Sequence, residues 1–181
     1  MPDPLPHPGP LSGVRVIEFG IIYSAPYGGM HLADFGADVI KVETPEGEMM
    51  RGNAAIVPGQ SKGFQWLNRG KRSLALNIAS PEGKEVIDRL IPETDVVLIN
   101  FRPGVAERLG IDYESLKRIN PRIIYAEIIG FGSEGPMGGA AATDIVAQGY
   151  GGAIALDAKL DDDGAPVWVN IPLADLPGGM S

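Results

Sequence analysis

Asp175 has the sequence setting of a catalytic nucleophile. It lies in an apolar stretch, residues 171–176, and is followed by Pro177, Gly178 and Gly179. Glycines allow a substrate to approach the backbone closely, and a helix beginning there would point its N–H groups at a nearby oxyanion. A carboxylate is ionised at neutral pH and can form an acyl intermediate without a separate base. The same aspartate could instead cap the helix, and residue types alone favour the cap.

Basic side chains are grouped at two places in a chain that is otherwise acidic. Arg69, Lys71 and Arg72 are close together, and Arg102 and Arg108 flank the end of an expected strand. The formal net charge of -8 argues against a general nucleic-acid or anionic-membrane surface. A local cluster of this kind suits a polyphosphate such as that of CoA. Solubilising surface charge explains the grouping equally well, so both interpretations stay open.

Composition excludes several other kinds of site. The chain has no cysteine, which rules out disulfides, thiolate nucleophiles and Cys-ligated metals and fits a cytoplasmic enzyme. His7 and His31 are its only histidines, and no metal site is expected. The acidic run at 161–163 predicts a solvated turn, because Pro172 stands where a calcium loop needs glutamate. Residues 1–10 are a proline-rich tail, and no membrane-spanning stretch is present.

Alternating strand and helix patterns predict an open α/β sheet. Residues 14–20, 25–35 and 38–43 have the length and order of one βαβ unit, which implies parallel strands. Later strands are expected at 73–78, 95–100 and 123–129, and later helices after Ser80 and at 105–109, 113–119 and 143–152. The last strand is nearly all apolar, as expected where both faces of a sheet are covered. The predicted fold class is therefore a Rossmann-like, mainly parallel sheet with flanking helices.

In such a sheet, ligands bind beyond the carboxyl ends of the strands. Three segments rich in Gly or Pro follow expected strands, at residues 20–26, 100–104 and 130–136. No Walker A sequence occurs, and no Gly-x-Gly-x-x-Gly follows the first strand. The ligand site is therefore expected at these three segments, without a conventional nucleotide motif.

Six short motifs occur in a fixed order along the chain. They are LSGVRVIEF at 11–19, LADFGADVIKVE at 32–43, NRGKRS at 68–73, NFRPG at 100–104, IGFG at 129–132 with GP at 135–136, and AD at 174–175 with GG at 178–179. Each is modest alone, whereas their order and spacing together are specific. The sequence resembles the amino-terminal portion of the family III CoA-transferases, which include formyl-CoA and carnitine CoA-transferases and the 2-methylacyl-CoA racemases.

This resemblance implies a CoA-transferase in which Asp175 attacks an acyl-CoA thioester. A mixed anhydride would form, the CoA thiolate would return to give an aspartyl-CoA thioester, and an acceptor carboxylate would then be activated. By matching position, the loop at residues 21–26 would line the thiol end of CoA and the acyl group. The implied CoA-binding residues are Ile22, Tyr23, Ser24, Lys71, Arg72, Asn100, Phe101, Arg102, Arg108, Phe131 and Gly132.

Two positions depart from the pattern of the family. The racemases place a histidine directly before the aspartate of a segment that matches Asp144, and this chain has Thr143 there. Without that imidazole the two-base proton shuttle is missing, so CoA transfer is preferred to racemisation. Tyr23 stands where some transferases have glutamine, so acyl specificity cannot be carried over. The alternatives are a racemase, isomerase or lyase on the same scaffold, and a non-catalytic CoA-binding fragment or subunit.

The chains of this family are also considerably longer. They continue into a smaller domain, return to the first, and interlock as a dimer in which a glycine-rich loop covers the active site. Residues 11–181 are therefore expected to form the CoA-binding large domain of an interlocked-dimer fold, truncated before the small domain and the return. The expected substrates are an acyl-CoA and a small carboxylic acid. The expected partner is an identical subunit in the full-length form, or a second chain.

Overall fold

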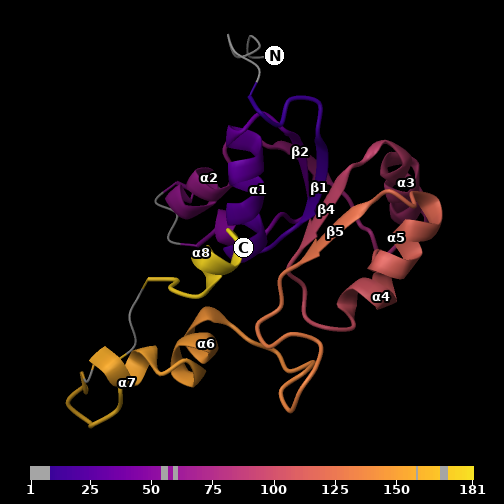
Figure 1. Ribbon diagram of the computed structural model, residues 1–181. Coiled ribbons are helices and arrows are strands. Elements are labelled where there is room, and N and C mark those ends of the chain that lie inside the picture. Colours follow the sequence, from indigo (N-terminus) through magenta and orange to yellow (C-terminus); the bar gives the residue numbers. More distant parts are fainter. Residues whose placement is uncertain (1–8, 54–56, 59–60, 158, 168–170) are drawn as a thin grey trace.

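The centre of the computed structural model is a five-stranded sheet in which every neighbouring pair of strands is parallel (Figure 1). The structure describes residues 9–53, 57–58, 61–157, 159–167 and 171–181. The strand order is β3-β2-β1-β4-β5. The strands are β1 (Arg15–Phe19), β2 (Asp38–Glu43), β3 (Arg72–Ala75), β4 (Val96–Ile99) and β5 (Ile124–Glu127). The Rossmann-like class predicted from the sequence is confirmed.

Helices cover both faces of this sheet. One side carries α1 and α2, with the short α8 beside α1, and the other carries α3, α4 and α5 (Figure 1). The helices are α1 (Ser24–Asp34), α2 (Lys62–Asn68), α3 (Pro81–Leu90), α4 (Val105–Leu109), α5 (Tyr113–Ile119), α6 (Asp144–Tyr150), α7 (Ala153–Asp157) and α8 (Asp175–Gly178), with 3-10 turns η1 (Met49–Arg51) and η2 (Ile91–Glu93). None of the described helices is long and apolar enough to cross a bilayer.

The strands bury alternate side chains on the two faces, as a two-residue period requires. Ile17 and Val97 belong to a large cluster that includes Ile87 of α3. Val16 and its neighbours on the other face form a smaller cluster that includes Ala25 of α1. Burying each large aliphatic side chain contributes about 1.5–3 kcal/mol, so these two clusters hold the sheet and thereby fix where its carboxyl edge lies.

Local sequence signals place the helix starts. The hydroxyl of Ser80 accepts a hydrogen bond from the N–H of Gly83 at 3.1 Å, and Pro81 follows as the first helical residue, as predicted. The predicted acidic turn is also confirmed, since the carboxylate of Asp161 accepts from the N–H groups of Asp163 and Ala165. Residues 1–8 of the proline-rich tail lie outside the described residues.

The last strand is less covered than its apolar sequence predicts. β5 is an edge strand, and Ile124 is 62% exposed. Tyr125 packs against the larger core cluster, and Ala126 packs against the smaller cluster on the opposite face, although α1 contacts mainly β1, β2 and β4. Both faces of this strand are therefore covered in part, and the expected cover is missing at Ile124.

Candidate active site

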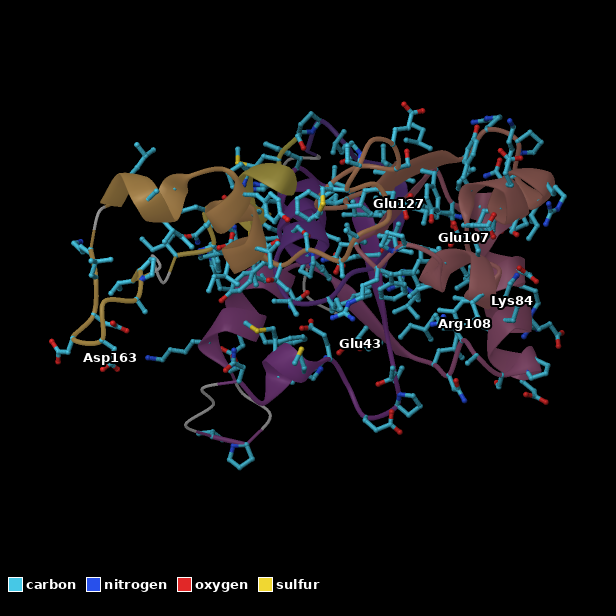
Figure 2. The ribbon with its side chains drawn as sticks, turned by 90° about the horizontal axis from the view of Figure 1, so that it is seen from below. Glu43, Lys84, Glu107, Arg108, Glu127 and Asp163 are labelled. Carbon is cyan, nitrogen blue, oxygen red and sulfur yellow. The ribbon has the colours of Figure 1, made fainter. Side chains whose placement is uncertain are left out.

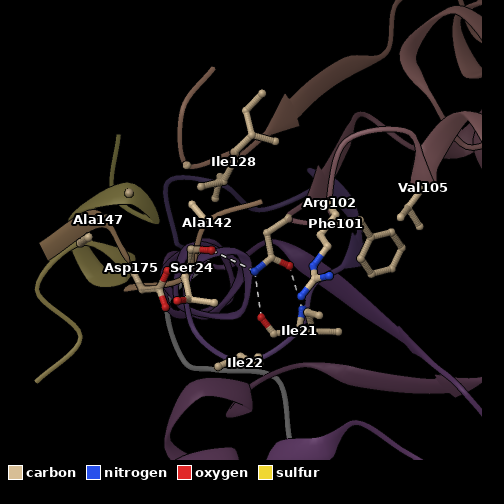
Figure 3. Close-up of a pocket in the computed structure, with 16 residues that line it drawn as sticks. Ile21, Ile22, Ser24, Phe101, Arg102, Val105, Ile128, Ala142, Ala147 and Asp175 are labelled. Carbon is tan, nitrogen blue, oxygen red and sulfur yellow. Dashed lines mark hydrogen bonds between the residues drawn. The ribbon is translucent and has the colours of Figure 1, made fainter. Parts of the chain in front are cut away.

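A cavity of about 540 Å3 lies at the carboxyl edge of the sheet, where this fold binds ligands (Figure 3). Its walls come from the loops after β1 and β4, the segment after β5, and helices α6 and α8. Much of the lining is aliphatic. The polar side chains in the lining are Ser24, Asn100, Arg102, Thr143 and Asp175. A cavity with an apolar wall and a few polar groups is typical of a small-molecule site.

Asn100 fixes the loop after β1 against the end of β4. Its amide nitrogen donates to the carbonyl of Ile21 at 2.8 Å and to the hydroxyl of Ser24 at 2.9 Å, and its oxygen accepts from the N–H of Ile21 at 2.9 Å (Figure 3). The next residue, Ile22, has a φ of 65°, which is the left-handed region that a β-branched side chain rarely adopts. Among the described residues it is the only non-glycine with positive φ. Strained backbone of this kind is concentrated at functional sites.

Asp175 is the first residue of α8, and it does not cap that helix. The carboxylate of Asp144, on α6, accepts the N–H of Ala174 at 2.7 Å and that of Asp175 at 3.0 Å. The buried Gln148 donates to the other oxygen of Asp144 and to the carbonyl of Ile171. The cap interpretation that residue types favoured is therefore wrong, because a carboxylate from another helix takes that role.

The carboxyl group of Asp175 is half-buried at the cavity wall. Burial, and to a smaller extent the negative charge of Asp144, raise the pKa of Asp175 to about 6. The group is therefore still mainly ionised at neutral pH, and it is more basic than a solvated aspartate. A perturbed carboxylate in a cavity is a candidate nucleophile.

Close glycine contacts bring α8 against α1. A Cβ atom added at Gly179 would lie 2.3 Å from the carbonyl oxygen of Ser24, and one at Gly28 would lie 2.8 Å from the carbonyl oxygen of Gly179. Neither position has room for a side chain. Gly179 therefore serves packing, whereas Gly178 lines the cavity. The glycines after Asp175 set the distance between the carboxylate and the loop after β1.

Six of the residues predicted from the sequence line this one cavity. They are Ile22, Ser24, Asn100, Phe101, Arg102 and Asp175. The other six lie outside its lining. These are Tyr23, Lys71, Arg72, Arg108, Phe131 and Gly132. Their roles in ligand binding stay predictions.

The three basic residues outside the lining have different surroundings. Lys71 is buried, with its amino group 2.7 Å from a carboxylate oxygen of Glu18, and burial lowers the pKa of Lys71 to about 8 although Glu18 opposes this. Arg72 pairs at 2.8 Å with Asp38, at the start of β2 and thus at the opposite edge of the sheet. Arg108 is exposed on α4, on the same side of the molecule as α3 (Figure 2).

The remaining three predicted residues lie in loops or before a helix, close in sequence to residues of the lining. The ring of Phe131 packs edge-on against that of Tyr150, with the centroids 5.1 Å apart. Gly132 follows with a φ of 73°. Tyr23 directly precedes α1 and is half-buried.

Several cavity residues were not found from the sequence. Val105 and Ile128 belong to ordinary apolar patterns, and Thr143 stands out in the sequence only as a departure from a family motif. Ala142 and Ala147 reach the cavity because α6 folds back towards the segment before Asp175, which no local pattern shows. Among the described residues, no group of three or more His, Asp or Glu side chains is arranged to hold a metal ion.

Comparison with known proteins gives one consistent family. The model described as CoA-transferase family III matches residues 11–181. A succinate–glutarate CoA-transferase of Agrobacterium fabrum is 38% identical over 179 residues, and a formyl-CoA:oxalate CoA-transferase of Streptomyces coelicolor is 40% identical over 171 residues. Each alignment covers 94% of this chain but only 44% and 41% of the respective relative. The chain thus spans less than half the length of these relatives.

Solved structures agree with this. The D175A mutant of Rv3272 from Mycobacterium tuberculosis superposes with a TM-score of 0.86 at 34% sequence identity. A CAIB/BAIF family protein from Brucella suis superposes with a TM-score of 0.84 at 41% identity. In both comparisons the match covers 96% of this chain and 47% of the other.

Proposed function

This chain belongs to CoA-transferase family III, and we propose that it moves CoA between small carboxylic acids through a covalent aspartyl-CoA thioester on Asp175. The observation that carries the proposal is a half-buried carboxylate of raised pKa in the wall of a largely aliphatic cavity at the carboxyl edge of the sheet. The aliphatic side chains can contact the acyl group while the carboxylate stays accessible to it.

In the proposed reaction an oxygen of Asp175 adds to the thioester carbonyl, the carbon–sulfur bond breaks, and the CoA thiolate leaves a mixed anhydride. The thiolate then adds to the aspartyl carbonyl and the donor carboxylate departs, which leaves CoA on Asp175. An acceptor carboxylate attacks this thioester and the thiolate returns to the new acyl group. Bonds are exchanged one for one, and the aspartate is regenerated.

The nucleotide end of CoA has a second hollow available to it. This hollow, of about 280 Å3, shares Ile21 and Phe101 with the Asp175 cavity and is lined by aliphatic side chains that include Val42, Leu76 and Ile78. It lies at the carboxyl ends of β1 and β2, where a Rossmann-like sheet binds a nucleotide. We place the adenine ring there, with the pantetheine arm passing Phe101.

Two arginines are available for the CoA phosphates. Arg102 and Arg108 are exposed, and neither forms a salt bridge with a carboxylate of the described part of the chain. Arg108 lies three residues after Val105 on α4, so both occupy one side of that helix, and Val105 lines the cavity. Guanidinium groups bind phosphate oxygens in a bidentate manner, which supports this assignment.

The decisive test is Asp175→Ala. We expect CoA transfer to fall by at least about 1000-fold, because the covalent step loses its nucleophile. Hydroxylamine added during turnover should convert Asp175 to a hydroxamate that mass spectrometry of its peptide detects. Asp163→Ala, in the exposed acidic turn, is the matched control and should keep full activity. Unchanged transfer in Asp175→Ala would rule out the proposal.

Racemisation or isomerisation on the same scaffold is the competing reaction. Thr143 lines the cavity where the racemase pattern has histidine, and His31, the one described histidine, lies in α1 outside the lining. A two-base shuttle therefore lacks its imidazole. Exchange of an α-proton of the acyl-CoA with deuterated water, without an acceptor acid, would support the competing reaction instead.

A cytoplasmic homodimer of the longer protein, or pairing with a second chain, is part of the proposal. Large apolar side chains are exposed over the segment from α6 onward, among them Tyr150, Leu156, Ile171 and Met180. Several large exposed apolar side chains along one segment support its burial against further protein. If this chain alone binds CoA but transfers none until a second polypeptide is added, it is a CoA-binding subunit. Analytical sedimentation of this chain, alone and with the second polypeptide, measures the assembly state in each case.

A further inference from the structure

Four charged side chains are buried together beneath the loop of residues 20–26. Glu18 of β1, Lys41 of β2, Glu48 and Lys71 each have at most 2% of the side chain exposed. The amino group of Lys41 lies 3.0 Å from Glu18 and 3.2 Å from Glu48, and that of Lys71 lies 2.7 Å from Glu18. Two positive and two negative charges make this buried charge network neutral.

The two lysines of the network hold the ends of the loop. Lys41 donates a hydrogen bond to the carbonyl of Gly20 at 2.7 Å, where the chain leaves β1. Lys71 donates to the carbonyl of Pro26 at 2.7 Å, in the first turn of α1. Main-chain carbonyls at both ends of the loop are therefore fixed from below by buried cations.

Glu48 holds the middle of the loop. One of its carboxylate oxygens accepts the N–H of Ile22 at 3.1 Å and that of Met50 at 3.2 Å, while the other oxygen faces Lys41. Ile22 is the residue with left-handed backbone, and it lines the cavity of Asp175. A strained conformation persists only where the surroundings over-determine it, and this charge-assisted hydrogen bond is one such constraint.

Both lysines of the network are surrounded by acceptors of the protein itself. Lys71 donates hydrogen bonds to the Pro26 carbonyl and to Asn68, and it forms an ion pair with Glu18. Lys41 donates to Glu18 and to the Gly20 carbonyl, and it forms an ion pair with Glu48. These contacts, with 2% of each lysine side chain exposed, support a structural part for both lysines.

Stability alone does not account for the network, because an apolar cluster of similar volume is usually at least as stable as buried ion pairs. We propose that these four side chains position the loop of residues 20–26 against Asp175, and that Glu48 is the positioning residue that keeps Ile22 left-handed at the cavity wall. This inference rests on the proposed function for its catalytic consequence. Its structural half stands on geometry alone.

The structural half is tested by amide hydrogen exchange, measured by NMR, in Glu48→Gln. Loss of the carboxylate should speed exchange of the Ile22 amide by at least about 10-fold, while Ile17 in β1 stays within about threefold of its original rate. Glu48→Asp, which keeps the charge but shortens the reach by one methylene group, should act in the same direction and serves if Glu48→Gln does not fold. Unchanged exchange at Ile22 in the folded variant would overturn the proposal.

The catalytic half is tested by a double-mutant cycle with Ile22→Gly. Glycine adopts positive φ without strain, so it no longer needs the carboxylate. Glu48→Gln should lower kcat by about 10- to 100-fold in the original background, with KM for acyl-CoA within about threefold, and by less than about threefold beside Ile22→Gly. Ile87→Val, a core substitution on the far face of the sheet, controls for lost stability and should leave kcat unchanged.

The outcomes separate this inference from the proposed function. If transfer depends on Asp175 but the Glu48→Gln loss is equal in both Ile22 backgrounds, the positioning role fails and the CoA-transferase stands. If Asp175→Ala keeps full activity, the proposed function fails, while faster exchange at Ile22 would still support the role of Glu48 in holding the loop.

Discussion

The two walls of the Asp175 cavity are built in opposite ways. The loop of residues 20–26 is held by four buried charges below it and by Asn100 beside it. The wall that carries Asp175 is a four-residue helix without a buried side chain, attached through Asp144 and close glycine contacts. The loop is therefore held by many contacts, whereas α8 has few contacts and is partly exposed. The well-held loop can define the shape of the cavity, while the weakly held α8 leaves the carboxylate of Asp175 within reach of a thioester.

The largest expected difference concerns stability. Glu18→Gln removes the carboxylate between two buried ammonium groups, and we expect the free energy of unfolding to fall by about 3–5 kcal/mol. Asp38→Asn, which breaks the exposed pair with Arg72, is the matched control and should change it by less than about 1 kcal/mol. Urea unfolding followed by circular dichroism measures both. Equal effects would show that the buried network adds no more stability than an exposed ion pair.

Substitutions that displace α8 should change activity rather than stability. In Gly179→Ala the new Cβ would lie 2.3 Å from the Ser24 carbonyl, so α8 must move away from α1. We expect kcat to fall by about 10- to 100-fold, because a shift of about 1 Å misplaces the carboxylate of Asp175.

The control for that substitution is Gly149→Ala in α6. A Cβ there meets only Ile154, at 3.9 Å, and alanine favours a helix over glycine. Its kcat should be unchanged and its midpoint of thermal unfolding unchanged or higher. A Gly179→Ala variant with unaltered kcat would mean that α8 tolerates displacement, and that the position of Asp175 is set by Asp144 instead.

The fold was predictable because its strands are apolar runs between turn residues. The exposure of Ile124 was not predictable, because an apolar run does not reveal which strand lies at the edge of the sheet. The site was only partly predictable. Asn100 and Arg102 follow a strand directly, so the topology brings them to the carboxyl edge. Residues of α6 reach the cavity through long-range folding. Glu18 and Lys41 did carry a local signal, since a charge inside a buried strand requires a partner, but the hydrophobic pattern ignores it.

The raised pKa of Asp175 predicts an acid limit for transfer. The protonated carboxyl group is not a nucleophile, so kcat/KM should fall about tenfold for each pH unit below about 6 and level off above it. The measurement is a pH profile of transfer at low acyl-CoA concentration, with circular dichroism at each pH to show that the fold is intact. A profile that stays flat down to pH 4.5 would contradict a half-buried nucleophile and would imply that this wall opens fully to solvent.

The smallest expected effect separates the two causes of that raised pKa. Asp144→Asn removes the nearby negative charge, while its amide oxygen can still accept the N–H groups of Ala174 and Asp175. The acid limb should therefore move to lower pH. It should stay above the range of a solvated aspartate, because burial is the larger cause and is unchanged. Asp162→Asn, in the exposed turn, should leave the limb in place. If Asp144→Asn instead lowers kcat at every pH without moving the limb, Asp144 acts mainly by holding α8. The position of α8 would then depend on the carboxylate of Asp144 as closely as the loop depends on Glu48.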